Sequence, residues 1–285
     1  MKKPPESSDG SFEHKDAGGR GGDVGAGAAF DDMPQPDSHG YFYATPTPKW
    51  ASSVLESMVE PIVPKGVDRA IGRYKMSMPD GIYVDAKLEG NTFTRPEVRT
   101  LLGGRHVAGH TLGEELMIAD MAVTSKRLIE LCSQGPVNIS QALCDDIYSV
   151  IARNATVRSH LMRADWIKNS GPLVALGSGY TFAAHDRVGL REIFDSGVGA
   201  INKIAHPVLR GATWASFATY HQFYWDANKR SSRYVMNAVL LSHGFDAILI
   251  GKEYANAYVD AVVASFKTGD LTKQIGFLLS QYDDA

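Results

Sequence analysis

Apolar residues return at helical spacing along most of the chain from Trp50 onward, and this periodicity limits the chain to a mainly helical fold. The clearest segments are residues 114–131 and 139–153, and the same pattern covers 187–204, 212–225 and 229–242. Gly244 follows the last of these, where a glycine commonly ends a helix. With 285 residues, the chain can bury a full core in one large domain or two small ones.

One stretch departs from the helical pattern and predicts a β-hairpin over residues 172–184. Two short apolar runs, Pro172-Leu-Val-Ala-Leu and Tyr180-Thr-Phe-Ala-Ala, lie on either side of Gly177-Ser-Gly179. Short apolar runs separated by a Gly-rich turn are typical of two antiparallel strands. We therefore expect a small hairpin within an otherwise helical chain.

The first 40 residues differ from the rest of the sequence. They are rich in Gly, Pro, Ser and Asp and contain almost no large apolar residues. Such a segment cannot bury enough surface to offset its ordering entropy, so we predict a disordered tail over residues 1–40. Residues 41–102 are then expected to form an N-terminal helical segment, and residues 103–285 the main domain with its C-terminal helices.

The N-terminal helical segment carries several helix boundaries. Residues 50–77 predict short helices broken by two prolines, and residues 81–89 predict a further helix that ends before a glycine. Thr94 and Glu97 form a capping box, in which each side chain satisfies an early backbone N–H group. This box predicts a helix that continues through Leu102.

Composition excludes several classes of protein. The 29 Lys and Arg residues against 32 Asp and Glu give a formal charge of −3, which argues against a nucleic-acid partner. Only Cys132 and Cys144 are present, each in an apolar helical pattern, so we predict two buried thiols and no disulfide framework. The sequence contains neither a long apolar run nor a secretory h-region. We therefore expect a cytoplasmic protein without a membrane partner.

The chemistry is expected in a polar segment between two apolar helices, which reads His221-Gln-Phe-Tyr-Trp-Asp-Ala-Asn-Lys-Arg-Ser-Ser-Arg233. A helix that begins here would present unpaired N–H groups and its positive dipole end to an anion. Asp226 offers the hard oxygen ligands that suit a divalent cation. Arg230 and Arg233 project from one face of the helix. The pattern indicates a phosphate site.

The second half of this segment, Asp226-Ala-Asn-Lys-Arg-Ser-Ser-Arg233, resembles the signature of the Fic/Doc (Fido) family. Upstream, Leu88-Glu-Gly-Asn-Thr-Phe-Thr-Arg-Pro-Glu-Val98 is similar to a stretch that opens many Fic proteins, and the expected hairpin lies where the family carries its flap. The resemblance implies an all-α bundle with a β-hairpin flap. It also implies transfer of AMP from ATP to a Ser, Thr or Tyr hydroxyl of a target protein.

The resemblance also assigns roles to individual residues. Asp226 would bind Mg²⁺, and Asn228 with the backbone around Lys229 would form an anion hole. Arg230 and Arg233 would hold the phosphates of ATP, since positioning and electrostatics dominate this kind of transfer. The flap would align the target peptide by strand pairing. Expected partners are the target hydroxyl, which can belong to the chain itself, and a second copy in a homodimer.

The histidine of the motif is displaced. In the family it stands four residues before the acid, whereas His221 stands five before Asp226 and Gln222 occupies the fourth place. In one register His221 is the catalytic residue and one residue is inserted after it. In the other register Gln222 replaces it, and we favour this because it needs no insertion in a tight turn. A glutamine amide does not titrate, so it cannot act as a general base.

Two alternatives to AMP transfer follow from these departures. Lys229 stands where glycine is commoner in the family and resembles the Doc branch, whose members transfer phosphate. Gln222 at the catalytic place is compatible with a Fic-fold protein that binds a nucleotide or a partner without efficient catalysis. His206-Pro207 imitates the start of the motif, but no acid follows it at the required distance, so we interpret it as a helix start.

A self-inhibitory motif is also indicated. Asp85-Ala-Lys-Leu-Glu89-Gly90 matches the family's inhibitory helix, apart from Asp in place of Ser or Thr. The resemblance implies that Glu89 pairs with Arg233 and competes with the terminal phosphate for it. Competition is plausible because carboxylates and phosphates both accept paired hydrogen bonds from a guanidinium.

Overall fold

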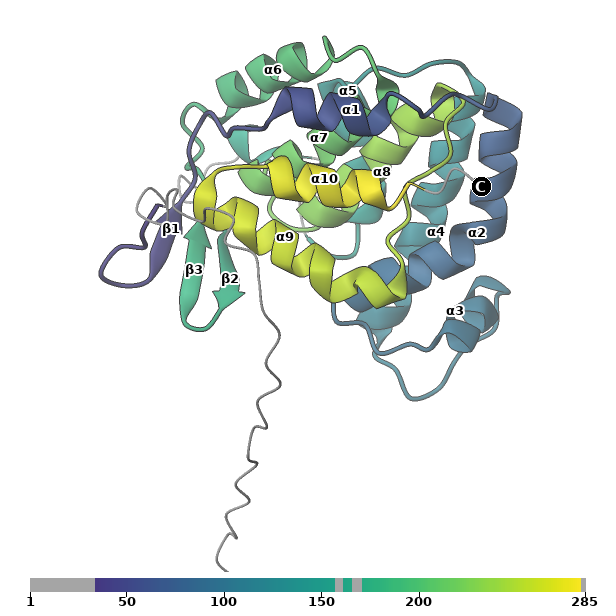
Figure 1. Cartoon of the computed structure of the whole chain (residues 1–285). Coiled ribbons are helices and arrows are strands. Elements are labelled where there is room, and N and C mark those ends of the chain that lie inside the picture. Colours follow the sequence, from purple (N-terminus) through teal and green to yellow (C-terminus); the bar gives the residue numbers. More distant parts are fainter. Residues whose placement is uncertain (1–33, 157–160, 166–170, 283–285) are drawn as a thin grey trace, which may run out of the picture. The chain divides into compact units, whose positions relative to one another are not determined.

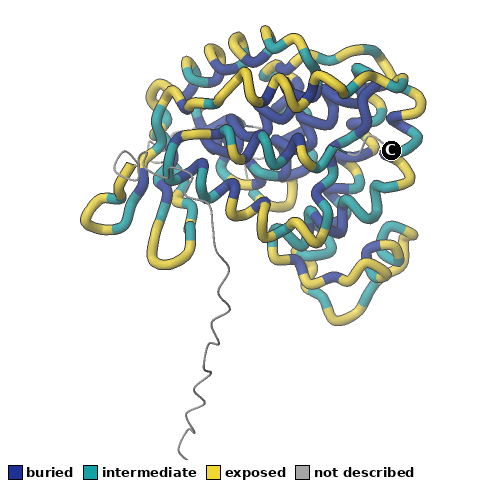
Figure 2. Tube along the Cα trace, viewed as in Figure 1, coloured by how far each residue is buried: buried dark blue, intermediate teal, exposed yellow. Residues whose placement is uncertain are grey.

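Two buried helices, α7 (Pro207–His221) and α8 (Asn228–Ser242), form the centre of the computed structural model (Figure 1). All residues of α7 except Pro207, and all residues of α8 except Lys229, are buried. Figure 2 shows them as the dark blue interior of the trace. The structure describes residues 34–156, 161–165 and 171–282. The turn between the two helices is thus held by the most completely buried part of the fold.

The other helices surround this pair. Contacts with α8 come from α2, α4 and α5, and contacts with α7 come from α1, α6, α9 and α10. The bounds are α1 Ser52–Val59, α2 Val67–Leu88, α3 Arg95–Leu102, α4 Leu112–Ser133, α5 Gln141–Ile151, α6 Leu190–Ile201, α9 Ala255–Thr268 and α10 Thr272–Ser280. Short 3-10 turns cover Arg163–Asp165 and Lys252–Tyr254. The described residues from Pro34 onward cluster as one compact unit, so the N-terminal helices pack on the same core.

Close packing of α7 on α8 depends on Gly211. A Cβ atom there would lie 2.6 Å from Leu240 Cδ1 and 3.1 Å from the carbonyl oxygen of Met236. We expect Gly211→Ala to lower the free energy of unfolding by about 1–3 kcal/mol, because an added methyl overpacks the core. Urea denaturation measures this change. The control is Gly199→Ala at an exposed position of α6, where nothing lies within 4 Å of the added Cβ and a gain of about 0.4–1 kcal/mol is expected.

Helix starts largely follow the sequence signals. The predicted capping box is confirmed, since Thr94 N donates to Glu97 Oε2 at 2.7 Å before α3. A second box, formed by Thr111 and Glu114, starts α4. The interpretation of His206-Pro207 as a helix start is also confirmed, because the His206 side chain accepts a hydrogen bond from Val208 N.

Two predicted helix boundaries were wrong. The expected break between residues 77 and 81 is absent, and α2 continues through Pro79. Proline removes one hydrogen bond to the residue four earlier, here Lys75, whose turn is exposed and open to water. The helix expected over residues 212–225 begins earlier, at Pro207, and ends at His221, because Gln222 adopts a left-handed conformation with φ 52°.

The predicted hairpin is confirmed as β2 (Leu173–Gly177) and β3 (Tyr180–Ala183), paired antiparallel. A third strand, β1 (Tyr41–Tyr43), pairs in parallel with β3 and was not predicted. The strand order is β1-β3-β2, so β2 forms an edge of the sheet beside α9 (Figure 1). Phe42 and Phe182 are register partners and are both buried, which joins the sheet to the helical core.

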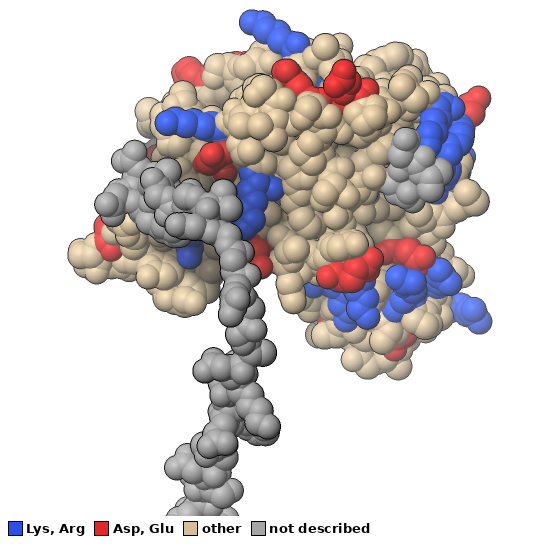
Figure 3. Space-filling model, viewed as in Figure 1, with Lys and Arg blue, Asp and Glu red and all other residues tan. Residues whose placement is uncertain are grey.

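Several composition-based expectations concern the rest of the chain. Cys132 and Cys144 are buried free thiols, as predicted. In the described residues, no helix combines the length and apolarity needed to span a bilayer. Acidic and basic side chains are intermixed on the face shown in Figure 3. Residues 1–33 of the predicted tail lie outside the described residues, while Asp37 accepts hydrogen bonds from the backbone of His39 and Tyr41.

Candidate functional site

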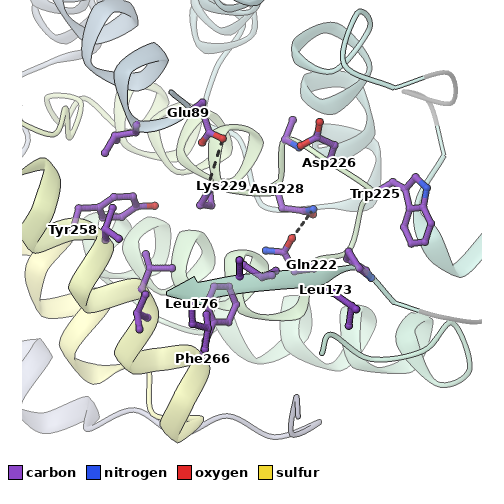
Figure 4. Close-up of a pocket in the computed structure, with 18 residues that line it drawn as sticks. Glu89, Leu173, Leu176, Gln222, Trp225, Asp226, Asn228, Lys229, Tyr258 and Phe266 are labelled. Carbon is purple, nitrogen blue, oxygen red and sulfur yellow. Dashed lines mark hydrogen bonds and ion pairs between the residues drawn. The ribbon is translucent and has the colours of Figure 1, made fainter. Parts of the chain in front are cut away.

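A cavity of about 330 Å³ lies beside the turn that joins α7 to α8 (Figure 4). Strand β2, helix α9 and the C-terminal end of α2 enclose its other sides. The apolar wall comes from β2 and α9 and includes Pro172, Leu173, Val174, Ala175, Leu176, Val259, Val262, Val263 and Phe266. The polar wall includes Glu89, Gln222, Asp226, Asn228, Lys229 and Tyr258. The cavity therefore offers one apolar and one charged side to a ligand.

Side-chain amides hold the turn in a fixed shape. Asn228 Oδ1 accepts from the backbone N–H of Tyr224 at 2.8 Å, and Asn228 Nδ2 donates to Gln222 Oε1 at 3.1 Å. Gln222 Nε2 in turn donates to the carbonyl of Thr219 at 2.6 Å. Gln222 and Ala227 both have left-handed backbones, with φ values of 52° and 55°. These bonds fix the Gln222 side chain at the cavity wall.

His221 does not reach the cavity. Its side chain is fully buried among Phe217, Phe223 and His185, and neither ring nitrogen has a hydrogen-bond partner among the described residues. Burial, with a smaller effect of His185, holds the pKa of His221 well below its usual value. Of the two candidates for the catalytic place, Gln222 lines the cavity and His221 belongs to the core.

The burial of His221 makes stability sensitive to acid. The pKa of His221 is lowered in the folded protein. Below about pH 6.5 the imidazole therefore binds a proton in the unfolded chain but not in the folded protein, and the free energy of unfolding falls as the pH falls. We expect His221→Phe to remove a loss of about 1.4 kcal/mol per pH unit below that point. Urea denaturation between pH 7 and 5 measures it. An exposed control, His39→Asn, should keep the wild-type slope, and an unchanged slope for His221→Phe would contradict the assignment.

The three cations of the motif occupy different places. Lys229 lines the cavity, whereas Arg230 and Arg233 are buried at 3% exposure each and are not part of its lining. Arg230 Nη2 is 3.9 Å from Asp226 Oδ1, and its Nε has no hydrogen-bond partner among the described residues. Arg233 is paired with Asp85: its Nε donates to Oδ1 at 3.0 Å, and its Nη2 lies 2.8 Å from the same oxygen as an ion pair. Both guanidinium groups keep one nitrogen without a hydrogen bond, but Arg233 has a close carboxylate partner and Arg230 only a distant one.

The expected pairing of Glu89 with Arg233 was wrong. Arg233 binds Asp85, and Glu89 Oε2 lies 3.8 Å from Lys229 Nζ at the cavity wall (Figure 4). The reason is helix register: Asp85 and Glu89, the C-cap residue of α2, are four residues apart, and so are the two cations on α8. Residues at this spacing share one helix face, so each carboxylate contacts the cation that lies directly opposite it: Asp85 contacts Arg233, and Glu89 contacts Lys229.

Comparisons with known proteins agree with this architecture. No protein-family model matches the sequence. A Fic family protein from Desulfovibrio desulfuricans G20 has a TM-score of 0.62 at 15% identity, over 84% of this chain and 74% of the other. A Fic domain containing signaling protein from Bacteroides thetaiotaomicron VPI-5482 has a TM-score of 0.61 at 17% identity, over 81% and 90%. The chain has the Fic fold.

A third Fic-fold structure, Fic-1 from C. elegans, has a TM-score of 0.61 at 17% identity, over 81% of this chain and 70% of the other. The helical bundle and the hairpin expected from the motif are thus confirmed. In this Fic fold the hairpin is extended by β1 into a three-stranded sheet. The motif turn faces the hairpin strand β2 across the cavity.

The start of α8 is open toward an anion. Its N-cap residue, Ala227, has a left-handed backbone, and no side chain caps the helix. The first N–H groups and the positive end of the helix dipole are therefore available to a ligand, and Arg230, whose Nε has no hydrogen-bond partner among the described residues, lies in the same first turn. Asp226 is 55% exposed at the cavity, which leaves its carboxylate accessible to a cation. These groups fit a metal-bound phosphate.

No cluster of three or more metal-ligating side chains occurs in residues 34–156, 161–165 and 171–282. A metal at Asp226 would therefore take its remaining ligands from the nucleotide and water, as Mg²⁺ commonly does. Sequence reasoning missed the part of α9 that forms the apolar wall. It also missed Tyr258, whose hydroxyl accepts from Arg233 Nη1 at 3.1 Å. Both lie in an ordinary amphipathic pattern that carries no functional signal.

Proposed function

We propose that this protein binds Mg-ATP in the cavity and is a Fic-type protein adenylyltransferase that moves AMP to a Ser, Thr or Tyr hydroxyl of a target protein. The observation that carries the proposal is the motif turn, from Gln222 to Lys229, which lines a cavity together with the edge strand β2. An edge strand offers unpaired backbone groups to a target peptide beside the bound nucleotide.

Each wall of the cavity has a role in this proposal. The apolar side chains of β2 and α9 would cover the base and sugar, while the open start of α8 and Arg230 would bind phosphate oxygens. Asp226 would hold Mg²⁺, which would neutralise charge on the phosphates. Asn228 keeps the turn in the shape that presents these groups.

The same cavity lacks a general base at the catalytic place. Gln222 can orient a hydroxyl through its amide, but it cannot take the proton. We therefore propose slow transfer, in which the attacking hydroxyl loses its proton to solvent. This feature also favours the second candidate, a Fic-fold protein that binds nucleotide without efficient catalysis. Self-inhibition would operate through Glu89, whose carboxylate pairs with Lys229 at the cavity wall, beside the place where phosphates would lie.

Arg230 gives a direct prediction about nucleotide binding. Because one guanidinium nitrogen is unused and its carboxylate is distant, we expect Arg230→Ala to weaken Mg-ATP binding by about tenfold or more, the value of a lost charge-assisted hydrogen bond. Titration calorimetry measures the affinity. The control is Arg127→Ala on α4, which removes an ion pair with Asp146. This variant should bind ATP with the affinity of the wild type. Equal affinities for all three proteins would contradict the phosphate role of Arg230.

The activity itself is tested by incubating the purified protein, alone and with cell extract, with ATP labelled at the α or the γ phosphate. AMP transfer predicts protein labelled from the α position only. Label from the γ position only would replace the proposal with phosphate transfer, to which Lys229 points. Saturable ATP binding without label from either position would support a nucleotide-binding function and would contradict the transferase activity.

A further inference from the structure

A buried arginine outside the motif contacts the motif turn from behind. Arg163 lies in the short 3-10 turn and is only 2% exposed. Its guanidinium donates to three carbonyl oxygens, those of Gln222, His221 at 3.1 Å and His185 at 2.8 Å. Its backbone N–H donates to the carbonyl of Phe223 at 2.9 Å. Every one of these bonds goes to backbone, none to a ligand-facing atom.

The four carbonyls belong to two parts of the candidate site. Three of them follow each other at the C-terminal end of α7, where the negative end of the helix dipole favours a cation. The fourth, that of His185, follows β3 two residues after the strand ends. Arg163 therefore links the motif turn to the base of the flap, although it does not line the cavity.

The backbone at Gln222 needs such support. A glutamine with φ 52° is held in the left-handed conformation, which few residues other than glycine adopt, so the surrounding structure must enforce it. The Arg163 guanidinium binds the carbonyl on each side of that residue's Cα, which fixes both adjoining peptide planes. Its five donors are spread over three nitrogens in one plane and reach three separate carbonyls, whereas a lysine ammonium concentrates its donors on one atom.

We propose that Arg163 is a positioning residue: it fixes the left-handed turn at Gln222 and sets the flap against it, so that the two walls of the cavity keep their separation. The consequence for ligand binding rests on the proposed function, while the consequence for the turn and the flap does not. Burial lowers the pKa of Arg163 to about 10, so the cation persists at neutral pH.

The chain offers a matched control in Arg210. It is also buried, at 9% exposure, and its guanidinium also donates to backbone carbonyls, those of Ile204 at 3.0 Å and Ala205 at 3.2 Å. These carbonyls precede α7, at the opposite end of the helix from the motif turn. Arg210→Met therefore removes a comparable buried arginine without touching the site.

The test uses the full chain with Arg163→Met, Arg163→Lys or Arg210→Met, compared by hydrogen exchange below the lowest melting temperature. In Arg163→Met we expect about tenfold faster exchange in peptides covering residues 218–226 and 180–186, and less effect in α4. Arg163→Lys should also exchange faster in these two regions. If Arg163→Met does not fold, this variant tests the proposal in its place. Arg210→Met should affect residues around 204–210 instead.

Binding of Mg-ATP is measured on the same proteins. We expect a loss of about tenfold for Arg163→Met and little change for Arg210→Met at equal stability. Uniformly faster exchange along the chain, or equal effects of the two arginines on the turn, would overturn the proposal and leave Arg163 as a stabilising residue only. If wild type binds no ATP while the two regions still respond to Arg163, the proposed function fails and the positioning role stands.

Discussion

Gln222→His is expected to raise the rate of AMP transfer by about 10²–10⁴-fold, the usual contribution of a well-placed general base. The substitution places a titratable group on the cavity wall, next to the start of α8, where Gln222 now contributes only an amide. The rate of self-modification or target modification, followed by intact mass with Mg-ATP, measures the effect. The affinity for Mg-ATP should change little, because the base acts on the attacking hydroxyl.

His221→Phe provides the control for this prediction. His221 lies in the aromatic core behind the turn, so its replacement should leave the transfer rate of both Gln222 and Gln222→His proteins unchanged. A folded His221→Phe protein that loses the wild-type transfer activity would contradict the register. It would return the role of base to His221.

The second large effect concerns the stability of the α2–α8 contact. Asp85→Asn should lower the free energy of unfolding by about 3–5 kcal/mol, because it leaves the Arg233 guanidinium buried without its counter-charge. Glu89→Gln should cost less than about 1 kcal/mol, since its partner Lys229 is 37% exposed and the ion pair is long, at 3.8 Å. Urea denaturation of the two variants compares the carboxylates directly.

The same two variants separate stability from inhibition. Glu89→Gln releases Lys229 and removes a negative charge from the cavity, so we expect tighter Mg-ATP binding at nearly unchanged stability. Arg233 stays bound to Asp85 in that variant. A larger stability loss for Glu89→Gln than for Asp85→Asn would show that Glu89 holds Arg233 after all. Unchanged ATP affinity would remove Glu89 from the inhibition.

Much of the fold was predictable because its signals are local. Helical periodicity located α4, α5 and α8, since each buries one face at regular spacing along its own sequence. The Thr94–Glu97 box and the Gly-rich turn of the hairpin depend on neighbouring residues only. The motif from Asp226 to Arg233 is equally local, and its first residues do line a cavity.

The features that escaped prediction depend on partners far apart in the chain. Strand β1 has three residues and pairs with Thr181 and its neighbours, about 140 positions away. No local sequence pattern therefore predicts this strand. The exchange of partners between Asp85 and Glu89 depends on how far α2 is displaced along α8, which sequence spacing does not determine. Arg163 lies in an irregular segment, and its role is set by carbonyls that every residue possesses.

The central claim is that nucleotide occupies the cavity between the motif turn and the flap. Photolabelling with a photoreactive ATP analogue in the presence of Mg²⁺, followed by digestion and peptide mass spectrometry, tests it most directly. We expect saturable adducts on the lining segments, within residues 172–176 or 258–266, which excess ATP suppresses and Arg230→Ala weakens. Label that ATP does not suppress, or label confined to other surfaces such as the groove between α4 and α5, would contradict it.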